Sequence, residues 1–359
     1  MSASQVTAKS SETRRDRRIV AFGGGTGMAA LLRGLKEYSD HITAVVTVTD
    51  NGGSSGRLRS EFEMAAPGDL RNCLLALADV DPLISRVFQY RFHEAEFKGH
   101  CFGNLFITVL NRVVGDFKGS IEELNRLLRV RGRVIPACEG RVSLVAHHPD
   151  GSKSTGEVQI TKSGKPIDRI ELQPQPVPLD PEIAEAVAEA DLFLFGPGSL
   201  YTSIIPNLLI GDLMDRIRAT GKPSVYVGNI MTQPGETVGY DLGDHIRALR
   251  RHVGDGFPDA VVAHNGRVPP EISENYRREG AGVVRQDLDD DPDFRNVRVV
   301  QRNFLAEDAV SSGRSARHDS SLLARVIFEE FVARVDGSDV EPSDVASSEN
   351  VVTPENSVQ

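Results

Sequence analysis

Tryptophan is absent from this sequence, and the aromatic content is only 6% of its 359 residues. Proteins that bind single-stranded nucleic acid stack the bases on aromatic side chains, so this scarcity gives no support for such a surface. The formal net charge of −10 also opposes binding to a polyanion. We therefore expect no nucleic-acid partner.

Cysteine is equally scarce, with Cys73, Cys101 and Cys138 far apart and no CxxC pair. An odd number at this spacing argues against both a disulfide framework and a zinc site. No apolar run approaches the roughly 18 residues of a membrane span, and the amino terminus lacks the apolar segment of a signal peptide. These absences predict a cytoplasmic protein without membrane insertion.

The two ends of the chain differ in composition from the rest. Residues 1–16 are polar, and residues 335–359 are rich in serine and acidic residues with no lysine or arginine. Such segments cannot bury enough apolar surface to fold. We predict a disordered amino terminus over 1–16, a folded domain over 17–334 and a disordered acidic tail over 335–359.

Within the folded part, apolar segments with the length of strands alternate with amphipathic helical segments. Continuous apolar strands are typical of a parallel sheet that is covered on both faces. The pattern predicts an α/β fold, Rossmann-like and doubly wound, with a mostly parallel sheet and helices on both faces. Residues 134–172 instead alternate between apolar and polar positions with turns, which predicts a small β-meander insertion. The predicted strands are 17–24, 41–50, 191–200, 224–230, 259–266 and 297–304, and the predicted helices are 26–38, 67–79, 103–114, 119–130, 181–189, 206–219, 237–253 and 321–334.

The first strand-to-helix turn contains the sequence GGGTG, and residues 25–30 fit the pattern G-x-G-x-x-A. Glycine allows the tight turn, and the free N–H groups at the start of the helix attract an anion. Asp50 ends the second strand about 20 residues later, where a dinucleotide fold places its ribose-binding acid. Asp50 could instead hold a metal ion or act as a nucleophile. The predicted phosphate-binding residues in this turn are Gly24, Gly25, Thr26 and Gly27.

The second loop, TDNGGSSGRLR, leaves the second strand at the same edge of the sheet. Doubly wound sheets bind their ligands at this carboxyl edge. Backbone N–H groups, hydroxyls and an arginine would form a second anion cradle there. The alternative is a flexible surface loop with solvated arginines. The candidate ligands are Asn51, Gly52, Gly53, Ser54, Ser55, Gly56 and either Arg57 or Arg59.

Two further glycine turns follow predicted strands, and each alone is a weak signal. They supply Gly196, Gly198 and Ser199, and then Asn229. Several polar residues elsewhere have both a structural and a functional interpretation. Asp69, Arg71 and Asn72 either face the cleft or start a helix, and Asn104, beside His100, either binds ligand or caps a helix. We expect His147 and His148 at the surface, and only one or two of Arg317, His318 and Asp319 in a site.

Several of these segments together resemble the YvcK family of gluconeogenesis factors, which is related in fold to the phospholactate transferases of coenzyme F420 synthesis. The resemblance covers about residues 17–330. The segments are GGGTG, TDNGGSSGRLR, PGDLRNCL, GHCFGNL, FGPGSLYTSIIPNLLI, NIMTQPGET and the late RHD.

The resemblance implies a cytoplasmic protein that binds UDP-N-acetylglucosamine and supports growth, cell shape and peptidoglycan precursor supply on gluconeogenic carbon sources. Tyr276 and Arg317 match positions that contact the nucleotide sugar: a tyrosine ring can stack on uracil or sugar, and an arginine can grip a diphosphate. Some members are phosphorylated by a Ser/Thr kinase just after the RHD, where this chain has Ser320. Thr353 in the tail is the alternative.

Three functions therefore remain open from the sequence. The favoured one is a ligand-sensing regulator that requires no cofactor, forms a homo-oligomer and signals to a protein partner in cell-wall metabolism. The second is a Mg²⁺-dependent transferase of the phospholactate transferase type, with Asp50 as metal ligand. The third is a dinucleotide oxidoreductase, which has only G-x-G-x-x-A and Asp50 in its favour.

Overall fold

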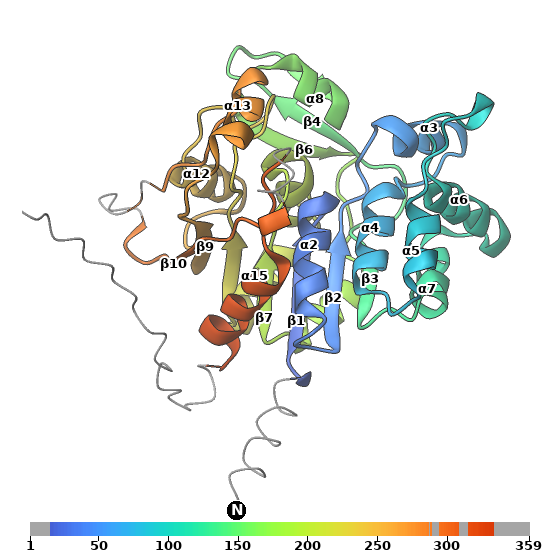
Figure 1. The fold of residues 1–359 in the computed structure, drawn as a ribbon, viewed down its shortest axis with the longest axis horizontal. Coiled ribbons are helices and arrows are strands. Elements are labelled where there is room, and N and C mark those ends of the chain that lie inside the picture. Colours follow the sequence, from blue (N-terminus) through green and yellow to red (C-terminus); the bar gives the residue numbers. More distant parts are fainter. Residues whose placement is uncertain (1–14, 287, 289–293, 309–314, 334–359) are drawn as a thin grey trace, which may run out of the picture.

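The computed structural model describes residues 15–286, 288, 294–308 and 315–333, and its centre is a seven-stranded sheet (Figure 1). The strand order is β10-β9-β8-β7-β1-β2-β3, and every pair of neighbours is parallel. The strands are β1 (Arg18–Gly23), β2 (His41–Val46), β3 (Arg133–Pro136), β7 (Leu192–Phe195), β8 (Ser224–Val227), β9 (Ala260–His264) and β10 (Arg298–Arg302).

The direction in which the chain fills the sheet reverses between β1 and β7. From β1 the chain moves through β2 to β3, whereas from β7 it moves the opposite way to β10. Because parallel crossovers are right-handed, the two halves place their helices on opposite faces of the sheet. The predicted doubly wound α/β fold is therefore confirmed. A sheet of this kind has a crevice where the order reverses, at the carboxyl ends of the strands.

The helices largely follow the predicted periodicity, except that the sequence prediction omitted α3 and α8, described below, and also α5 and α13. Helices α5 and α13 both begin at a proline in the first turn, and Asp81 caps α5 by accepting a hydrogen bond from Leu83 N. The helices are α2 (Gly25–Leu35), α3 (Gly53–Glu61), α4 (Gly68–Leu77), α5 (Pro82–Gln89), α6 (Phe102–Val114), α7 (Phe117–Leu127), α8 (Glu157–Ser163), α9 (Pro181–Glu189), α10 (Ile205–Leu208), α11 (Leu213–Thr220), α12 (Leu242–Val253), α13 (Pro270–Arg278) and α15 (Ser320–Ile327), with the 3₁₀ turn η1 (Ala95–Phe97) and the π-helical segments η2 (Leu200–Ile204) and η4 (Phe328–Val332).

Helix α2 lies between α15 and α4 in front of the sheet (Figure 1). Its buried residues include Met28, Leu31, Leu32 and Leu35, at the spacing that the sequence predicted. Gly34 faces α15 so closely that a Cβ there would overlap the carbonyl oxygen of Ser320. The absence of a side chain at Gly34 therefore sets the distance between these two helices.

The β-rich insertion begins later than predicted. Residues 133–136 form β3, which pairs in parallel with β2 at the edge of the main sheet. The insertion proper is an antiparallel sheet of β4 (Ser143–His147), β5 (Lys153–Thr155) and β6 (Arg169–Gln173), in the order β5-β4-β6.

Helix α8 separates β5 from β6, where the alternating pattern suggested a strand. The reason is tertiary, because Asn51 Oδ1 accepts a hydrogen bond of 2.9 Å from Val158 N in the first turn of α8. The side chain of a distant loop thus satisfies a backbone donor that periodicity within the insertion could not account for.

The segment after Asp50 is also different from the expected glycine-rich loop. From Gly53 onward it forms α3, and Ser54, Ser55 and Gly56 are buried. A Cβ at Gly56 would overlap the carbonyl oxygen of Asn51. Glycine at this position therefore permits a tight turn into a helix, where the sequence suggested flexibility.

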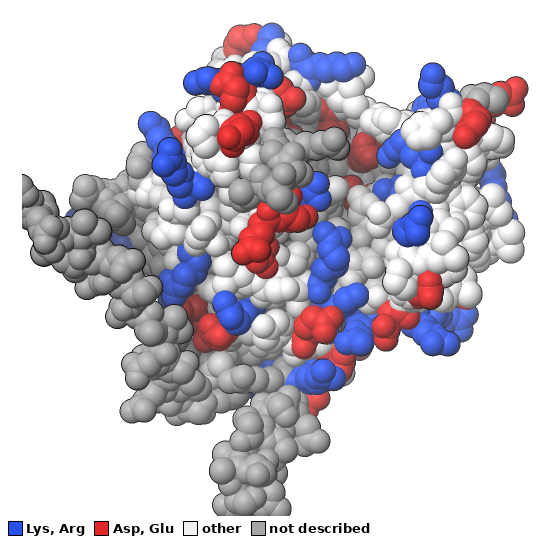
Figure 2. Space-filling model, in the orientation of Figure 1, with Lys and Arg blue, Asp and Glu red and all other residues white. Residues whose placement is uncertain are grey.

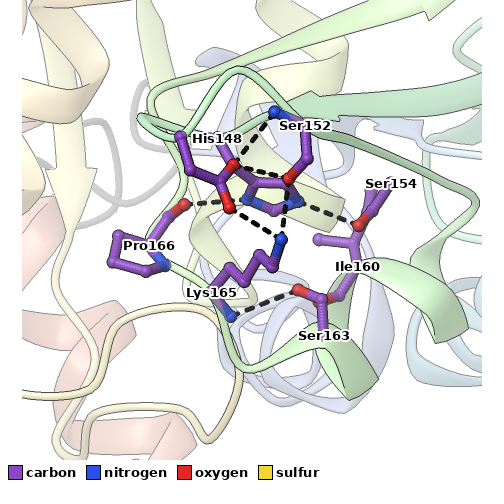
Figure 3. Close-up of polar contacts among 8 residues, drawn as sticks. His148, Ser152, Ser154, Ile160, Ser163, Lys165 and Pro166 are labelled. Atoms are coloured by element: carbon purple, nitrogen blue, oxygen red, sulfur yellow. Dashed lines mark hydrogen bonds and ion pairs between the residues drawn. The ribbon is translucent and has the colours of Figure 1, made fainter.

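His148 is buried at 4% exposure, so its prediction as a surface residue was wrong. Its ring bridges two parts of the insertion (Figure 3): Nδ1 lies 2.8 Å from the carbonyl oxygen of Pro166, and Nε2 lies 2.8 Å from Oγ of Ser154. A carbonyl oxygen can only accept, so Nδ1 carries a proton, and in the neutral ring the Ser154 hydroxyl donates to Nε2. Nearby, Lys165 donates to Asp150. The histidine holds the turn between α8 and β6.

In the described part of the chain, no helix is long and apolar enough to cross a membrane. The three cysteines are buried and unpaired. Most of the amino-terminal segment, the acidic tail and Thr353 lie outside the described residues.

Substituting Gly34 tests how tightly α2 and α15 pack. Alanine favours a helix by up to about 1 kcal/mol over glycine, but overpacking costs about 1–3 kcal/mol. Because the overlap is with backbone, side-chain rotation cannot relieve it. We expect Gly34→Ala to lower the free energy of unfolding in urea by about 1–2 kcal/mol. Gly282→Ala is the control, because a Cβ there meets nothing within 4 Å. Equal stability of the two variants would contradict this packing.

Candidate functional site

A cleft of about 870 Å³ opens at the carboxyl ends of β1, β2, β7 and β8, where the strand order reverses. Residues that follow each of these strands line it, including Gly24, Asp50, Pro197 and Asn229. Parts of α2, α4 and α13 and residues 315–318 complete the wall. Its position is the one at which doubly wound sheets bind their ligands.

The GGGTG loop forms the floor of the cleft and leads directly into α2, whose first turn no side chain caps. A Cβ at Gly24 would lie 2.5 Å from Oδ2 of Asp69, and a Cβ at Gly27 would lie 2.7 Å from the carbonyl oxygen of Pro197. Only glycine permits such approaches. The loop is therefore held between α4 and the loop after β7, and the amino end of α2 favours an anion in the cleft.

The loops after β7 and β8 are tied together by side chains. Asn229 Oδ1 accepts from Gly198 N at 3.2 Å, and its Nδ2 donates to Gly198 O at 2.8 Å. Buried Glu236 accepts from Tyr201 N at 3.1 Å and from the Thr202 hydroxyl at 2.9 Å. Burial raises the pKa of Glu236 to about 7. These contacts hold Gly198 and Ser199 in place at the cleft.

Three carboxyl groups, on Asp50, Asp69 and Glu157, lie on the cleft wall. Removal from water, then the charge of Asp50, raises the pKa of Asp69 to about 7, although the Gly25 N–H opposes the shift by hydrogen bonding. Removal from water and the charges of Asp50 and Asp69 raise the pKa of Glu157 to about 8. Asp50 itself accepts from Gly52 N at 2.7 Å. At neutral pH the carboxyl groups of Asp69 and Glu157 are therefore partly protonated, whereas exposed carboxyl groups would be ionised.

Four arginines also line the cleft, in two pairs. Arg33 on α2 has its pKa lowered first by burial and then by the positive charge of Arg317. Arg71 on α4 has its pKa lowered by burial and, among the charges, by Arg91. Within the described residues none of these four arginines forms an ion pair. Positive charge without a carboxylate partner is what an anionic ligand requires.

Ser54, Ser55 and Asn104 lie beneath the cleft and do not line it. Asn104 Nδ2 donates to Ser54 Oγ at 3.2 Å, and Asn104 Oδ1 accepts from the Arg71 guanidinium. Ser54 Oγ also lies 3.2 Å from Nδ1 of His100. The stem of Arg71 crosses Gly103, where a Cβ would lie 2.6 Å from Cδ of the arginine. These residues of three separate sequence segments therefore position one arginine.

Arg59 was expected in an anion cradle, and the structure places it elsewhere. Arg59 is 5% exposed, and its guanidinium donates to the carbonyl oxygens of Thr49 and Val142. It joins the end of β2 to the start of the insertion. Burial lowers the pKa of Arg59, and the paired carbonyls satisfy donors that would otherwise be costly to bury.

The three residues of the RHD segment, Arg317, His318 and Asp319, have different surroundings, as expected for side chains of adjacent residues. Arg317 is exposed at the rim, and His318 Nε2 donates to the carbonyl oxygen of Gly228 at 3.2 Å. Burial lowers the pKa of His318 to about 4, so the ring is neutral at pH 7. Asp319 caps α15 by accepting from Leu322 N. Ser320 is the first residue of α15.

The structure brings about half of the predicted site residues into the cleft wall. Those that line the cleft are Gly24, Gly25, Thr26, Gly27, Asp50, Gly198, Ser199, Asn229, Tyr276 and Arg317. Those that do not are Asn51, Gly52, Gly53, Ser54, Ser55, Arg59, Asn104 and Gly196. Of the undecided residues, Asp69, Arg71 and Asn72 are in the wall.

Sequence reasoning missed Arg33, Gln89, Arg91 and Glu157 as cleft residues. Arg33 had a usable signal, because it follows Thr26 by two helical turns and therefore shares its face of α2. Arg91 and Glu157 had none, because the return of residues 79–101 and the placement of α8 are tertiary features.

The transferase alternative requires a Mg²⁺ site, and only some of the ligands for one are present in the cleft. Among the residues that the structure describes, no group of three or more His, Cys, Asp or Glu could hold a metal ion. Mg²⁺, however, commonly takes one or two carboxylates together with waters and substrate phosphates. Asp50 and Asp69, both in the cleft wall, are the residues that would serve.

The fold and the cleft define a Rossmann-like α/β protein with a large cleft at its topological switch point. The family model described as 2-phospho-L-lactate transferase CofD matches residues 19–305, and the chain belongs to this family, in the branch of the YvcK gluconeogenesis factors.

The alignments with its relatives cover most of this chain and most of each relative. The gluconeogenesis factor of Bacillus subtilis is 44% identical over 314 residues, 87% of this chain and 97% of the relative. That of Halalkalibacterium halodurans is 43% identical over 319 residues, 88% of this chain and 97% of the relative. A solved structure from Bacillus halodurans superposes with a TM-score of 0.82 at 39% identity, covering 87% of this chain and 99% of that one.

The raised pKa values of Asp69 and Glu157 predict how stability depends on pH. Because their folded-state pKa values lie above those of an unfolded chain, protonation stabilises the fold at low pH. That contribution is lost as pH rises through about 7 for Asp69 and about 8 for Glu157. We expect the free energy of unfolding to fall from about pH 4, near the unfolded carboxyl pKa values, to above about pH 8, where both folded carboxyls have released their protons, and Asp69→Asn with Glu157→Gln to flatten the curve.

Urea unfolding at several pH values measures this effect. Asp215→Asn is the control, because its side chain is 84% exposed. Buried Glu236 remains in all variants and accounts for residual slope. A double variant that loses stability as steeply as the original protein would show that these two carboxyls are not desolvated.

Proposed function

We propose that this protein binds UDP-N-acetylglucosamine in the cleft and acts as a ligand-sensing regulator. The observation that carries the proposal is the pair Arg33 and Arg317, which lacks a carboxylate partner in the described structure. Arg33 lies on α2, whose uncapped amino end faces the cleft, and Arg317 lies just before α15. A diphosphate would supply the negative charge that pairs with these two arginines and with the amino end of α2.

Each part of the ligand has a candidate contact. The diphosphate would accept from the first turn of α2, from Gly198 and Ser199, and from Arg317. Tyr276 is partly buried in the wall beside Ala316, and its ring would stack on uracil or sugar. Asp50 at the end of the second strand segment would accept from a ribose hydroxyl. Burial raises the pKa of Tyr276, which keeps its hydroxyl protonated.

The physiological part of the proposal comes from the relatives, two of which carry the name gluconeogenesis factor. We place this chain in the same role, supporting growth on gluconeogenic carbon sources from the cytoplasm. The proposal includes effects on cell shape and cell-wall precursor supply, a protein partner in cell-wall metabolism, a Ser/Thr kinase and a homo-oligomeric state. No cofactor is required for such sensing.

The family model supports the second candidate, a Mg²⁺-dependent transferase acting on a nucleotide-activated substrate. Mg²⁺ held by Asp50 and Asp69 would neutralise diphosphate charge as the leaving group departs. The raised pKa of Glu157 would suit a proton acceptor for the attacking hydroxyl.

Removing the Arg317 side chain tests the nucleotide-sugar assignment. A charge-assisted contact to a diphosphate contributes about 1.5–3 kcal/mol, so Arg317→Ala should weaken binding of UDP-N-acetylglucosamine about 10- to 100-fold in titration calorimetry. NAD and GDP serve as ligand controls. Arg277→Ala is the matched variant, because Arg277 is exposed on α13 outside the cleft wall. An unchanged affinity in Arg317→Ala would refute the assignment.

A turnover assay separates the regulator from the transferase. We expect UDP-N-acetylglucosamine incubated with the protein and Mg²⁺ to be recovered intact by chromatography, because sensing consumes no ligand. Consumption of the ligand that needs Mg²⁺ and disappears in Asp50→Asn would replace the regulator with the transferase. Binding of NADH in preference to the nucleotide sugar would favour an oxidoreductase.

A further inference from the structure

The nucleotide-sugar proposal accounts for one arginine pair and leaves the other unexplained. Helices α13 and α15 lie on one side of α2, and α4 and α5 lie on the other (Figure 1). Arg33 lies on α2 and is close enough to Arg317, just before α15, for the two charges to interact, whereas Arg71 lies on α4 and Arg91 follows α5. The cleft extends to both pairs.

Arg71 is buried in an unusual state. The residue is 8% exposed. One terminal nitrogen of its guanidinium donates to Asn104 Oδ1, and the other donates to Asn72 Oδ1 at 2.8 Å. Its Nε, by contrast, is buried without a hydrogen-bond partner. A buried charged donor without an acceptor costs free energy, and natural proteins rarely keep one without a use.

The charges around Arg71 leave it incompletely neutralised. Burial lowers the pKa of Arg71 most and Arg91 lowers it further, whereas Cys101, Asp69 and Asp50 raise it. In the described structure neither of these two aspartates forms an ion pair with Arg71. Arg91 is exposed, donates to Gly99 O at 2.7 Å and has no ion-pair partner in the described residues either.

Two neutral groups complete this end of the cleft. The side chains of Asn72 and Gln89 line it next to the two arginines. Since Asn72 Oδ1 already accepts from Arg71, its amide nitrogen is left as a donor. Two guanidinium groups and amide donors form a set that matches the oxygens of one anionic group.

The size and the surroundings of the cleft favour a small ligand here. A volume of about 870 Å³ is near the upper end of the range of about 300–1,000 Å³ for ligand pockets, which leaves room beside a first ligand. The surrounding face mixes acidic and basic side chains without a broad area of either sign (Figure 2). This face therefore offers a polyanion no continuous positive surface.

We propose that Arg71, Asn72, Gln89 and Arg91 form a second binding subsite, for the phosphate or carboxylate group of a small metabolite. This metabolite would occupy the cleft together with the ligand held by Arg33 and Arg317. Ser54 and Asn104 are positioning residues, because they hold the Arg71 guanidinium. The assignment does not depend on the identity of the first ligand.

The test uses the full-length protein and titrates it by calorimetry with inorganic phosphate and, separately, with succinate. Saturable binding of phosphate alone would identify a phosphate ligand, and binding of succinate alone a carboxylate ligand. We expect Arg91→Ala to weaken the bound probe about tenfold or more, as loss of a charge-assisted contact should. Arg86→Ala, an exposed arginine on α5 outside the cleft wall, should bind like the original protein.

Two further measurements show where the anion binds and exclude loss of folding as the reason for weaker binding. Arg71→Lys keeps a positive charge but removes Nε, so it should also weaken the probe, with folding checked by circular dichroism. The titration is repeated with saturating UDP-N-acetylglucosamine, beside which the probe should still bind.

Absence of binding by both probes, displacement by the nucleotide sugar, or equal affinity in Arg91→Ala and Arg86→Ala would each overturn the subsite. If the nucleotide sugar itself does not bind, the comparison of Arg91→Ala with Arg86→Ala still decides the subsite, while the proposed function fails by itself.

Discussion

The contact between two glycine loops at the centre of the sheet is the constraint on which the site depends. Gly27 approaches the carbonyl oxygen of Pro197 so closely that no side chain could be placed between them. This contact joins the loop after β1 to the loop after β7, the two strands at which the direction of winding reverses. It thereby directs the amino end of α2 and the backbone at Gly198 toward the same space. A larger residue at Gly27 would separate the two loops and open the floor of the cleft.

The cleft also contains both acidic and basic side chains that do not form ion pairs with one another in the described structure. Three carboxyls and four arginines line one cavity, yet in the described structure the arginines have no carboxylate partners. Removal from water shifts the pKa values of Asp69 and Glu157 upward, which reduces the negative charge near neutral pH. The wall is consequently more receptive to an anion than its composition suggests. This state costs stability, and a bound anion would recover part of that cost.

Several polar residues in the sequence motifs act on the cleft indirectly. Ser54 and Asn104 lie under the cleft and hold Arg71, while Asn51 caps α8 and Arg59 joins β2 to the insertion. Their side chains satisfy buried donors and acceptors, as buried polar groups must be satisfied. A motif that resembles a ligand loop can thus be a scaffold for the residues that do face the ligand.

The sequence by itself determined the doubly wound fold and the GGGTG turn, because hydrophobic periodicity and glycine turns are local properties. It placed Asp50 in the segment after the second strand, although β2 ends at Val46, four residues earlier than predicted. It also located the Tyr276 and Arg317 candidates through family resemblance. Only the tertiary structure decided that residues 53–61 form a helix, that His148 is buried and that Arg91 and Glu157 reach the cleft. These outcomes depend on contacts between residues distant in the chain, such as Asn51 with Val158 and Arg71 with Gly103. Local patterns carry no information about such contacts, because their free energy arises only when the elements meet.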